Sequence, residues 1–231
     1  MPPSTPTRPR AGRDSFPTNG RPVQVERFAP RGAARAAALV LHGADGLTYR
    51  GPSYRGLARG LAGQGFLALL VHYFDSTGGG FQGFLHEPFR FMTWMQAVAD
   101  GVGYARAQPD GEAPRVGLVG FSLGAYLSLA VAAQDERVAA VVDVFGGLHE
   151  LLLPGVTRLP PVLILHGDAD PVVPVREAYN LEVLLKALGV PHEMHIYPGA
   201  GHSFYGATAD DAFRRITTFL TKHLSGGDSS G

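Results

Sequence analysis

The sequence predicts an α/β fold in which a mostly parallel central sheet is flanked by helices. Continuous apolar runs, typical of strands buried on both faces, alternate along the chain with segments of helical periodicity. Such alternation is typical of βαβ units, which place parallel strands in one sheet. The chain has 231 residues, 45% of them hydrophobic, which is enough for one domain with a sizeable core.

The predicted domain covers residues 21–224, and no second domain boundary is evident in the sequence. Residues 1–20 are rich in Pro, Arg, Ser and Thr, and we expect them to form a flexible tail that is too polar to pack. Residues 225–231 have the same character and are expected to form a second tail.

The strands are expected in the following order. Residues 22–28 alternate apolar and polar side chains, which predicts an edge strand. The runs 37–42 and 65–73 are continuously apolar and predict central strands. The remaining predicted strands are 116–121, 138–145, 161–166 and 192–197.

Helical periodicity falls between these strands. Apolar residues recur three or four positions apart, which predicts helices with one buried face. The predicted helical segments lie around residues 54–61, 91–102, 123–131, 178–188 and 213–224.

Gly120-Phe121-Ser122-Leu123-Gly124 matches the pattern G-x-S-x-G. The match follows the buried run 116–119 and precedes an apolar helical run, the setting that a nucleophile elbow requires. The turn would lift the Ser122 hydroxyl above the sheet at a helix N-terminus, where developing negative charge is favoured. Ser122 is therefore the candidate nucleophile. The alternative is an ordinary N-cap serine in a glycine-rich turn.

A serine nucleophile needs a base and an orienting carboxylate, which follow it in the order acid then histidine in this kind of fold. His202 lies in a glycine-rich loop between the last predicted strand and the last helix, which suits a base. Asp168 and Asp170 both follow the strand 161–166. We favour Asp170 as the orienting acid, and we expect Asp168 to bind nearby loop amides.

The loop that follows the strand 37–42 is the candidate oxyanion loop. One oxyanion donor is expected from the residue after the nucleophile, Leu123, and the other from this loop, at Ala44. Two preorganised amides would stabilise a tetrahedral intermediate. The alternative is a plain glycine-rich turn, and His42 is expected to be structural.

The segments GFSLG, HGDADPVVP and YPGAGHSF together resemble the dienelactone hydrolase family of α/β-hydrolases, over about residues 22–224. The resemblance implies an α/β-hydrolase fold without a separate lid domain and a metal-independent hydrolase. It also implies Ser122, Asp170 and His202 as the catalytic triad, with Ala44 and Leu123 as oxyanion donors.

The chain departs from the dienelactone-cleaving members at two positions. Ser122 stands where they carry a cysteine, and Gly43 stands where they carry an acidic residue. The resemblance therefore implies a serine carboxylesterase acting on a small ester or lactone. A peptidase or thioesterase on the same triad, or a non-catalytic hydrolase-like binding protein, are the alternatives.

The segment 74–91 is the longest stretch without a predicted element. Its aromatic residues could line an acyl or aryl pocket, because ligand sites are mostly apolar. The candidate substrate-binding residues are Tyr73, Phe74, Phe81 and Leu148. The alternative is that the aromatic residues of 74–91 pack the core beside Trp94.

The charge and cysteine content limit the function classes. Basic and acidic residues number 20 each, so a role that depends on a basic excess, with nucleic acid or an acidic membrane, is not expected. The absence of cysteine excludes disulfides and thiolate metal sites and is compatible with a cytoplasmic location. We expect a small-molecule ester as the partner, with no metal, no cofactor and no membrane segment, and the oligomeric state stays open.

Overall fold

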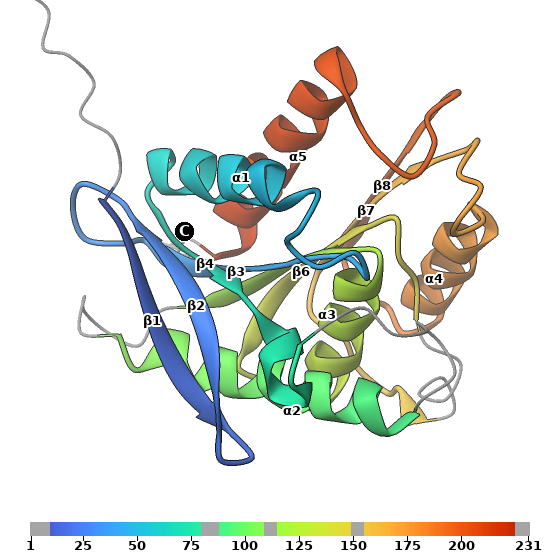
Figure 1. Cartoon of the computed structure of the whole chain (residues 1–231). Helices are drawn as coiled ribbons and strands as arrows, with labels where there is room; N and C mark the ends of the chain where they lie inside the picture. The colour runs from blue at the N-terminus through green and yellow to red at the C-terminus, as the bar shows by residue number, and fades with distance from the viewer. Residues whose placement is uncertain (1–9, 80–87, 109–114, 149–154, 225–231) are drawn as a thin grey trace, which may run out of the picture.

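The structure, a computed structural model, describes residues 10–79, 88–108, 115–148 and 155–224. It confirms the predicted α/β architecture, in which one eight-stranded sheet is flanked by helices (Figure 1). The strands are β1 (Arg10–Thr18), β2 (Arg21–Ala29), β3 (Ala36–Leu41), β4 (Phe66–Val71), β5 (Val116–Phe121), β6 (Val138–Val144), β7 (Val162–Gly167) and β8 (His192–Tyr197). The helices are α1 (Gly51–Gly63), η1 (Tyr73–Thr77), α2 (Pro88–Arg106), α3 (Leu123–Gln134), α4 (Arg176–Ala187) and α5 (Gly206–Leu224).

The strand order in the sheet is β1-β2-β4-β3-β5-β6-β7-β8. β2 pairs antiparallel with β1 and with β4, and every other pair is parallel. Because parallel strands end at the same edge of a sheet, the loops after β3, β5, β7 and β8 gather at one edge, where α/β folds build their sites.

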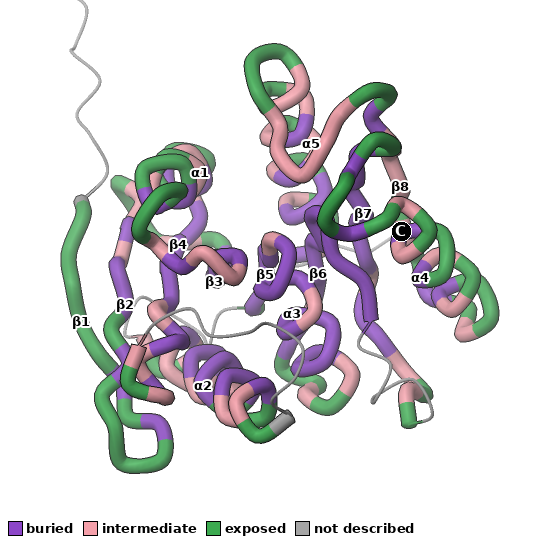
Figure 2. Tube along the Cα trace, turned by 45° about the vertical axis from the view of Figure 1, so that its right-hand side comes forward, coloured by how far each residue is buried: buried purple, intermediate pink, exposed green. Residues whose placement is uncertain are grey.

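The helices form two layers on opposite faces of the sheet. α1 and α5 cover one face, while α2, α3 and α4 cover the other (Figures 1 and 2). Two apolar clusters correspond to these faces, and β3 and β4 are buried along their whole length between them. In the part of the chain that the structure describes, no helix combines the length and the apolar character needed to cross a bilayer.

The prediction of a flexible tail over residues 1–20 is wrong for Arg10–Thr18, which form strand β1. As a result, 22–28 lies in the second strand of the sheet and is not an edge strand. The physical reason is that Phe16 is only 5% exposed and stacks on the ring of Tyr104 at 5.4 Å. The remaining tail residues, 1–9 and 225–231, lie outside the described part of the chain.

The expectation of an irregular stretch over residues 74–91 is also corrected. Tyr73–Thr77 form the 3₁₀ helix η1, and Phe91 belongs to α2. Phe74 packs its ring against Trp94 at 4.8 Å, and Phe91 joins the same buried cluster. Phe74 and Phe91 therefore fill the core, whereas Phe89 at the start of α2 is exposed.

Candidate active site

Ser122 occupies a sharp turn between β5 and α3. Its backbone angles are φ 52° and ψ −117°, a conformation that is strained for any residue with a side chain. The Ser122 amide donates to the Val144 carbonyl oxygen over 2.8 Å, which fastens the turn to β6. A Cβ atom at Gly120 or Gly124 would overlap neighbouring backbone. Close packing therefore requires both glycines of the motif.

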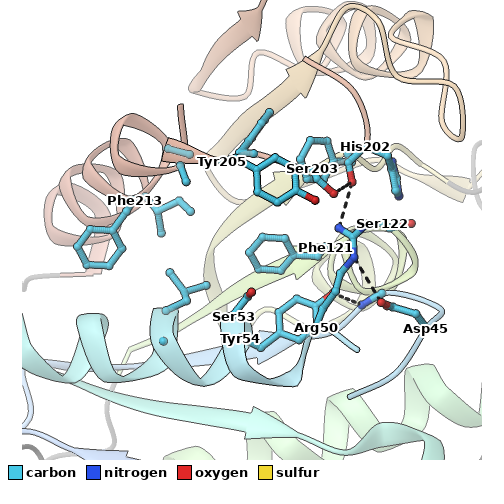
Figure 3. A pocket seen from close by; sticks show the side chains of 18 of the residues that line it. Asp45, Arg50, Ser53, Tyr54, Phe121, Ser122, His202, Ser203, Tyr205 and Phe213 are labelled. Atoms are coloured by element: carbon cyan, nitrogen blue, oxygen red, sulfur yellow. Dashed lines mark hydrogen bonds and ion pairs between the residues drawn. The ribbon is translucent and has the colours of Figure 1, made fainter. Parts of the chain in front are cut away.

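The Ser122 hydroxyl faces a cavity of about 640 Å³ that His202 and Ala44 also line. Ser122 is 9% exposed, and its hydroxyl makes no hydrogen bond to any residue that the structure describes. In Figure 3, Ser122 and His202 lie at one end of this cavity and Phe213 lies at the other. Catalytic hydrogen bonds are often long before substrate binds, so the two side chains remain compatible with proton transfer.

Hydrogen bonds with two tyrosines, one a donor and one an acceptor, hold the loop after β3. Tyr73 donates its hydroxyl to the His42 carbonyl oxygen over 2.7 Å. The Gly43 amide donates to the Tyr54 hydroxyl over 3.0 Å. Neither the Ala44 amide nor the Leu123 amide has an acceptor within the described residues, and Leu123 begins a helix, where amides lack intrahelical partners. Both amides are therefore available to an oxyanion.

His42 also stabilises the loop after β3. Its ring stacks on the ring of Tyr73 at 4.1 Å, and its Nδ1 donates to the Gly43 carbonyl oxygen over 2.8 Å. Burial lowers the pKa of His42 to about 4, so the ring is neutral at pH 7. A neutral ring that is 1% exposed fits a structural role.

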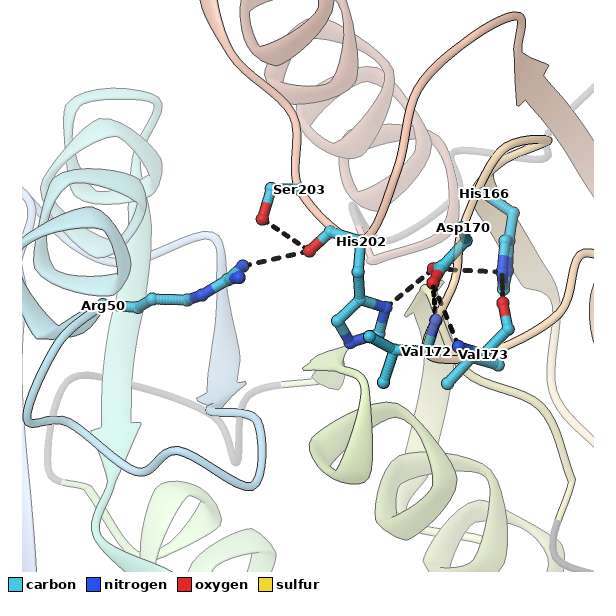
Figure 4. Close-up of polar contacts among 7 residues, drawn as sticks. All are labelled: Arg50, His166, Asp170, Val172, Val173, His202 and Ser203. Atoms are coloured by element: carbon cyan, nitrogen blue, oxygen red, sulfur yellow. Dashed lines mark hydrogen bonds and ion pairs between the residues drawn. The ribbon is translucent and has the colours of Figure 1, made fainter.

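His202 and Asp170 are joined by a short hydrogen bond. His202 lies in the loop between β8 and α5, and its Nδ1 is 2.7 Å from the Asp170 Oδ2 atom (Figure 4). The other oxygen of Asp170 accepts the amides of Val172 at 2.8 Å and Val173 at 3.0 Å. Because a carboxylate only accepts, Nδ1 carries the hydrogen, and Nε2 is free to take a proton.

Two further side chains shape these loops. His166 is fully buried, and its Nε2 donates to the Val173 carbonyl oxygen over 2.9 Å, 3.5 Å from the Asp170 carboxylate. Burial lowers the pKa of His166, which favours the neutral ring, and the ring holds the turn through its bond to Val173. Asp168 accepts the Gly199 amide at 2.6 Å, which links the loops after β7 and β8.

Arg50 and Tyr54, which the sequence did not single out, belong to this site. The Arg50 Nη1 donates to the His202 carbonyl oxygen over 3.1 Å, and its Nε lies 3.4 Å from the Asp45 carboxylate. Arg50 thus connects the loop after β3 to the loop that carries His202 (Figures 3 and 4). Tyr54 belongs to the predicted helical segment 54–61, whose apolar spacing predicted only a buried face. Nothing in the sequence predicted that its hydroxyl would contact the Gly43 amide.

Three of the four predicted substrate-binding residues do not line this cavity. Tyr73, Phe74 and Leu148 are buried in the cluster on the α2 and α3 face. Phe81 lies outside the described residues. The cavity is instead lined by α1 and α5, on the other face of the sheet, and by the loops that carry Ala44, Ser122 and His202.

No group of three or more His, Asp or Glu side chains suited to a metal ion occurs among the residues that the structure describes. The cavity is lined by the Ser122 hydroxyl, the His202 imidazole and Ala44, while the Asp170 carboxylate is bonded to the His202 ring and Leu123 follows Ser122 in the chain.

Comparison with known proteins identifies the family that this chain resembles over most of its length. The dienelactone hydrolase family matches residues 25–223. A putative carboxymethylenebutenolidase of Yersinia pestis is 23% identical over 191 residues, covering 72% of this chain and 72% of that protein.

Solved structures share the fold. A dienelactone hydrolase from Anabaena variabilis superposes with a TM-score of 0.76 at 22% identity, covering 94% of this chain and 100% of that one. A dienelactone hydrolase-like promiscuous phosphotriesterase from metagenomic libraries gives a TM-score of 0.79 at 22% identity, with coverages of 95% and 100%.

Proposed function

Because the chain belongs to the dienelactone hydrolase family of α/β-hydrolases and is a carboxylic ester hydrolase, we propose that it cleaves a small ester or lactone through an acyl-enzyme. Ser122 is the nucleophile, His202 is the general base and Asp170 is the orienting acid. The observation that carries this assignment is the 2.7 Å bond from His202 to Asp170 beside a strained Ser122, at a cavity shared with Ala44.

In the acylation step, His202 Nε2 takes the Ser122 proton as the hydroxyl oxygen attacks the ester carbonyl carbon. Asp170 stabilises the resulting imidazolium and keeps Nδ1 protonated, while the two backbone amides bound to its Oδ1 fix the carboxylate in place. The imidazolium then protonates the leaving alkoxide, and the alcohol departs.

The tetrahedral intermediate carries its negative charge next to Ala44 and Leu123. Their amides donate to the oxyanion, and the N-terminus of α3 adds a favourable dipole. Loss of one such donor typically costs about 3 kcal/mol of transition-state stabilisation. Water then attacks the acyl-enzyme, with His202 again removing the proton, and the carboxylic acid is released.

The cavity favours an uncharged substrate. Within the described lining, Arg50 is the only Arg or Lys, and it already contacts Asp45 and the His202 carbonyl oxygen. A free carboxylate on the substrate would have to compete for that cation. We therefore expect neutral esters to be cleaved faster than esters that carry a free acid.

Labelling with a fluorophosphonate, followed by peptide mapping, tests the nucleophile. We expect one adduct, on Ser122, and none in the Ser122→Ala variant. Esters, thioesters and peptides of matched acyl group then separate the esterase from a thioesterase or peptidase. A folded protein that takes no label would instead support the non-catalytic binding protein.

A further inference from the structure

The cavity extends well beyond the reacting groups, into a groove between α1 and α5. We call this part the α1–α5 groove, and its walls are formed by Leu57, Gly60, Ala209, Ala212, Phe213 and Ile216. We propose that the α1–α5 groove binds an elongated apolar chain of the ester substrate. The proposal rests on the proposed function, because it assigns a substrate class to the same site.

The cavity is larger than a minimal ester requires. An apolar cavity of about 150 Å³ accommodates a benzene molecule. The cavity at Ser122 holds about 640 Å³, which is within the range of pockets for ligands much larger than a minimal ester. Most of this space would stay unused if the substrate carried only a short acyl and a short alcohol group.

The walls of the α1–α5 groove are apolar. No charged side chain is present among the residues that define the groove, whereas Asp45 and Arg50 lie near the end of the cavity that holds Ser122 (Figure 3). Val172 and Tyr205, which also line the cavity, are 62% and 78% exposed. An apolar chain could therefore pass from an apolar rim into an apolar groove and lose contact with water.

Two glycines of α1, Gly56 and Gly60, line the cavity. A glycine inside a helix costs about 1 kcal/mol relative to alanine, so two on the cavity side require a reason. A Cβ atom on Gly60 would lie 2.7 Å from the Phe213 ring, so Gly60 allows that ring to lie against α1. A Cβ atom on Gly56 would meet nothing within 4 Å, so Gly56 leaves space beside the groove.

The apolar chain can come from the acyl half or from the alcohol half of the ester, and two substrate series distinguish these sources. The first series is p-nitrophenyl acetate, butyrate, hexanoate and octanoate. The second is the acetate esters of ethanol, butanol, hexanol and octanol. Burial of one methylene contributes about fourfold in binding. We expect kcat/KM to rise at least tenfold along one series, and that series identifies the chain that enters the groove.

Gly56→Leu tests the location, because its side chain would project into the open space at the groove. We expect the ratio of kcat/KM for the longest to the shortest ester to fall at least tenfold. Gly63→Leu is the matched control, since Gly63 is also on α1, has no neighbour within 4 Å of a Cβ atom and is absent from the described cavity lining. Its ratio should equal that of the wild type.

The outcomes separate this inference from the proposed function. If the protein hydrolyses both series through Ser122 and kcat/KM does not depend on chain length, the proposed function stands. The proposal that the groove binds an apolar chain is then wrong. The same holds if Gly56→Leu and Gly63→Leu change the ratio equally. A folded protein whose Ser122 takes no fluorophosphonate overturns the function itself. A thermal melt of each variant checks that the fold is intact.

Discussion

Asp168 and Asp170 illustrate how two like residues in one loop acquire different roles. Asp170 contacts the His202 ring, whereas Asp168 accepts the Gly199 amide. Asp170→Asn would leave the geometry but favour the wrong tautomer of the imidazole, so we expect kcat to fall by about 10⁴-fold. Asp168→Asn should lower kcat by less than about tenfold. Steady-state hydrolysis of p-nitrophenyl acetate measures both, and the reverse ranking would exclude Asp170 as the orienting acid.

Asp143, on β6, is a buried carboxyl that the proposed mechanism does not use. It is fully buried, and neither oxygen has a hydrogen-bond partner within the described residues. Burial raises the pKa of Asp143 to about 7, and the nearby Gly146 amide offsets part of that rise. The carboxyl is therefore largely protonated in the folded protein at moderately acidic pH.

The raised pKa predicts a specific pH dependence of stability. Between about pH 4 and pH 7 the folded state holds a proton that an unfolded aspartate has released, so stability falls as the pH rises. Asp143→Asn removes this loss. We expect the variant to gain about 2 to 3 kcal/mol relative to the wild type between pH 5 and pH 8, measured by urea unfolding. If the free energy of unfolding of the wild type and of Asp143→Asn changed with pH in the same way, the Asp143 carboxyl would be ionised in the folded protein and its pKa would not be raised.

At the scale of elements, α1 has two roles in this protein. It is anchored to the sheet by Arg55, which donates both to Glu26 Oε2 at 2.7 Å and to Glu26 Oε1 at 2.6 Å. The helix also provides Tyr54, whose hydroxyl accepts the Gly43 amide, and it provides Gly56 and Gly60, which line the cavity. The position of α1 therefore determines both the shape of the oxyanion loop and the width of the cavity.

Tyr54→Phe tests the first of these roles. The change removes the acceptor for the Gly43 amide and leaves a buried donor unsatisfied, which loosens the loop next to Ala44. We expect kcat for a short ester to fall about tenfold with little change in KM, because the oxyanion contact matters mainly in the transition state. Tyr104→Phe, which loses a hydrogen bond to Asp14 far from the cavity, is the control. An equal effect of the two changes would contradict the role of Tyr54.

The sequence was most informative where burial is uniform. Continuous apolar runs such as 37–42 and 116–121 are buried on both faces, so their pattern predicted the central strands. Strand β1 was missed because Phe16 is its one large buried apolar side chain and the rest of the segment is polar or small, with one proline. A half-exposed edge strand leaves little periodicity to detect.

The site was predictable only in its short motifs. Ser122, Asp170 and His202 lie in loops that directly follow strands, so local sequence was enough to nominate them. The cavity walls depend on how α1 and α5 approach each other, which no local pattern encodes. The glycines inside the helical pattern of α1 were the available signal, since interior glycines usually mark a packing or functional requirement.

At the scale of the whole molecule, the groups that we propose to react all follow strands that end at one edge of the sheet. The loops after β3, β5, β7 and β8 supply Ala44, Ser122, Asp170 and His202. The central strands that precede them are buried on both faces, so the spacing of these loops is held by the best-packed part of the protein. Among the described residues, the antiparallel strands β1 and β2 contribute nothing to the cavity lining, so β1 has a role other than building the site.

We expect β1 to protect β2, because β1 is the edge strand and carries charged side chains and Pro17, which make an edge a poor template for pairing. It covers the outer side of β2 along nine residue pairs, and Phe16 packs against Gly101 and Tyr104 of α2. A chain that begins at Arg21 would expose the backbone donors and acceptors of β2, which are a template for pairing with another copy. Light scattering after size exclusion should show concentration-dependent association of this shortened chain. Phe16→Ala in the full chain should lower stability by about 2 kcal/mol without association, because β1 still covers the edge. If the shortened chain matched the full chain in size and stability, β1 would be a dispensable tail after all.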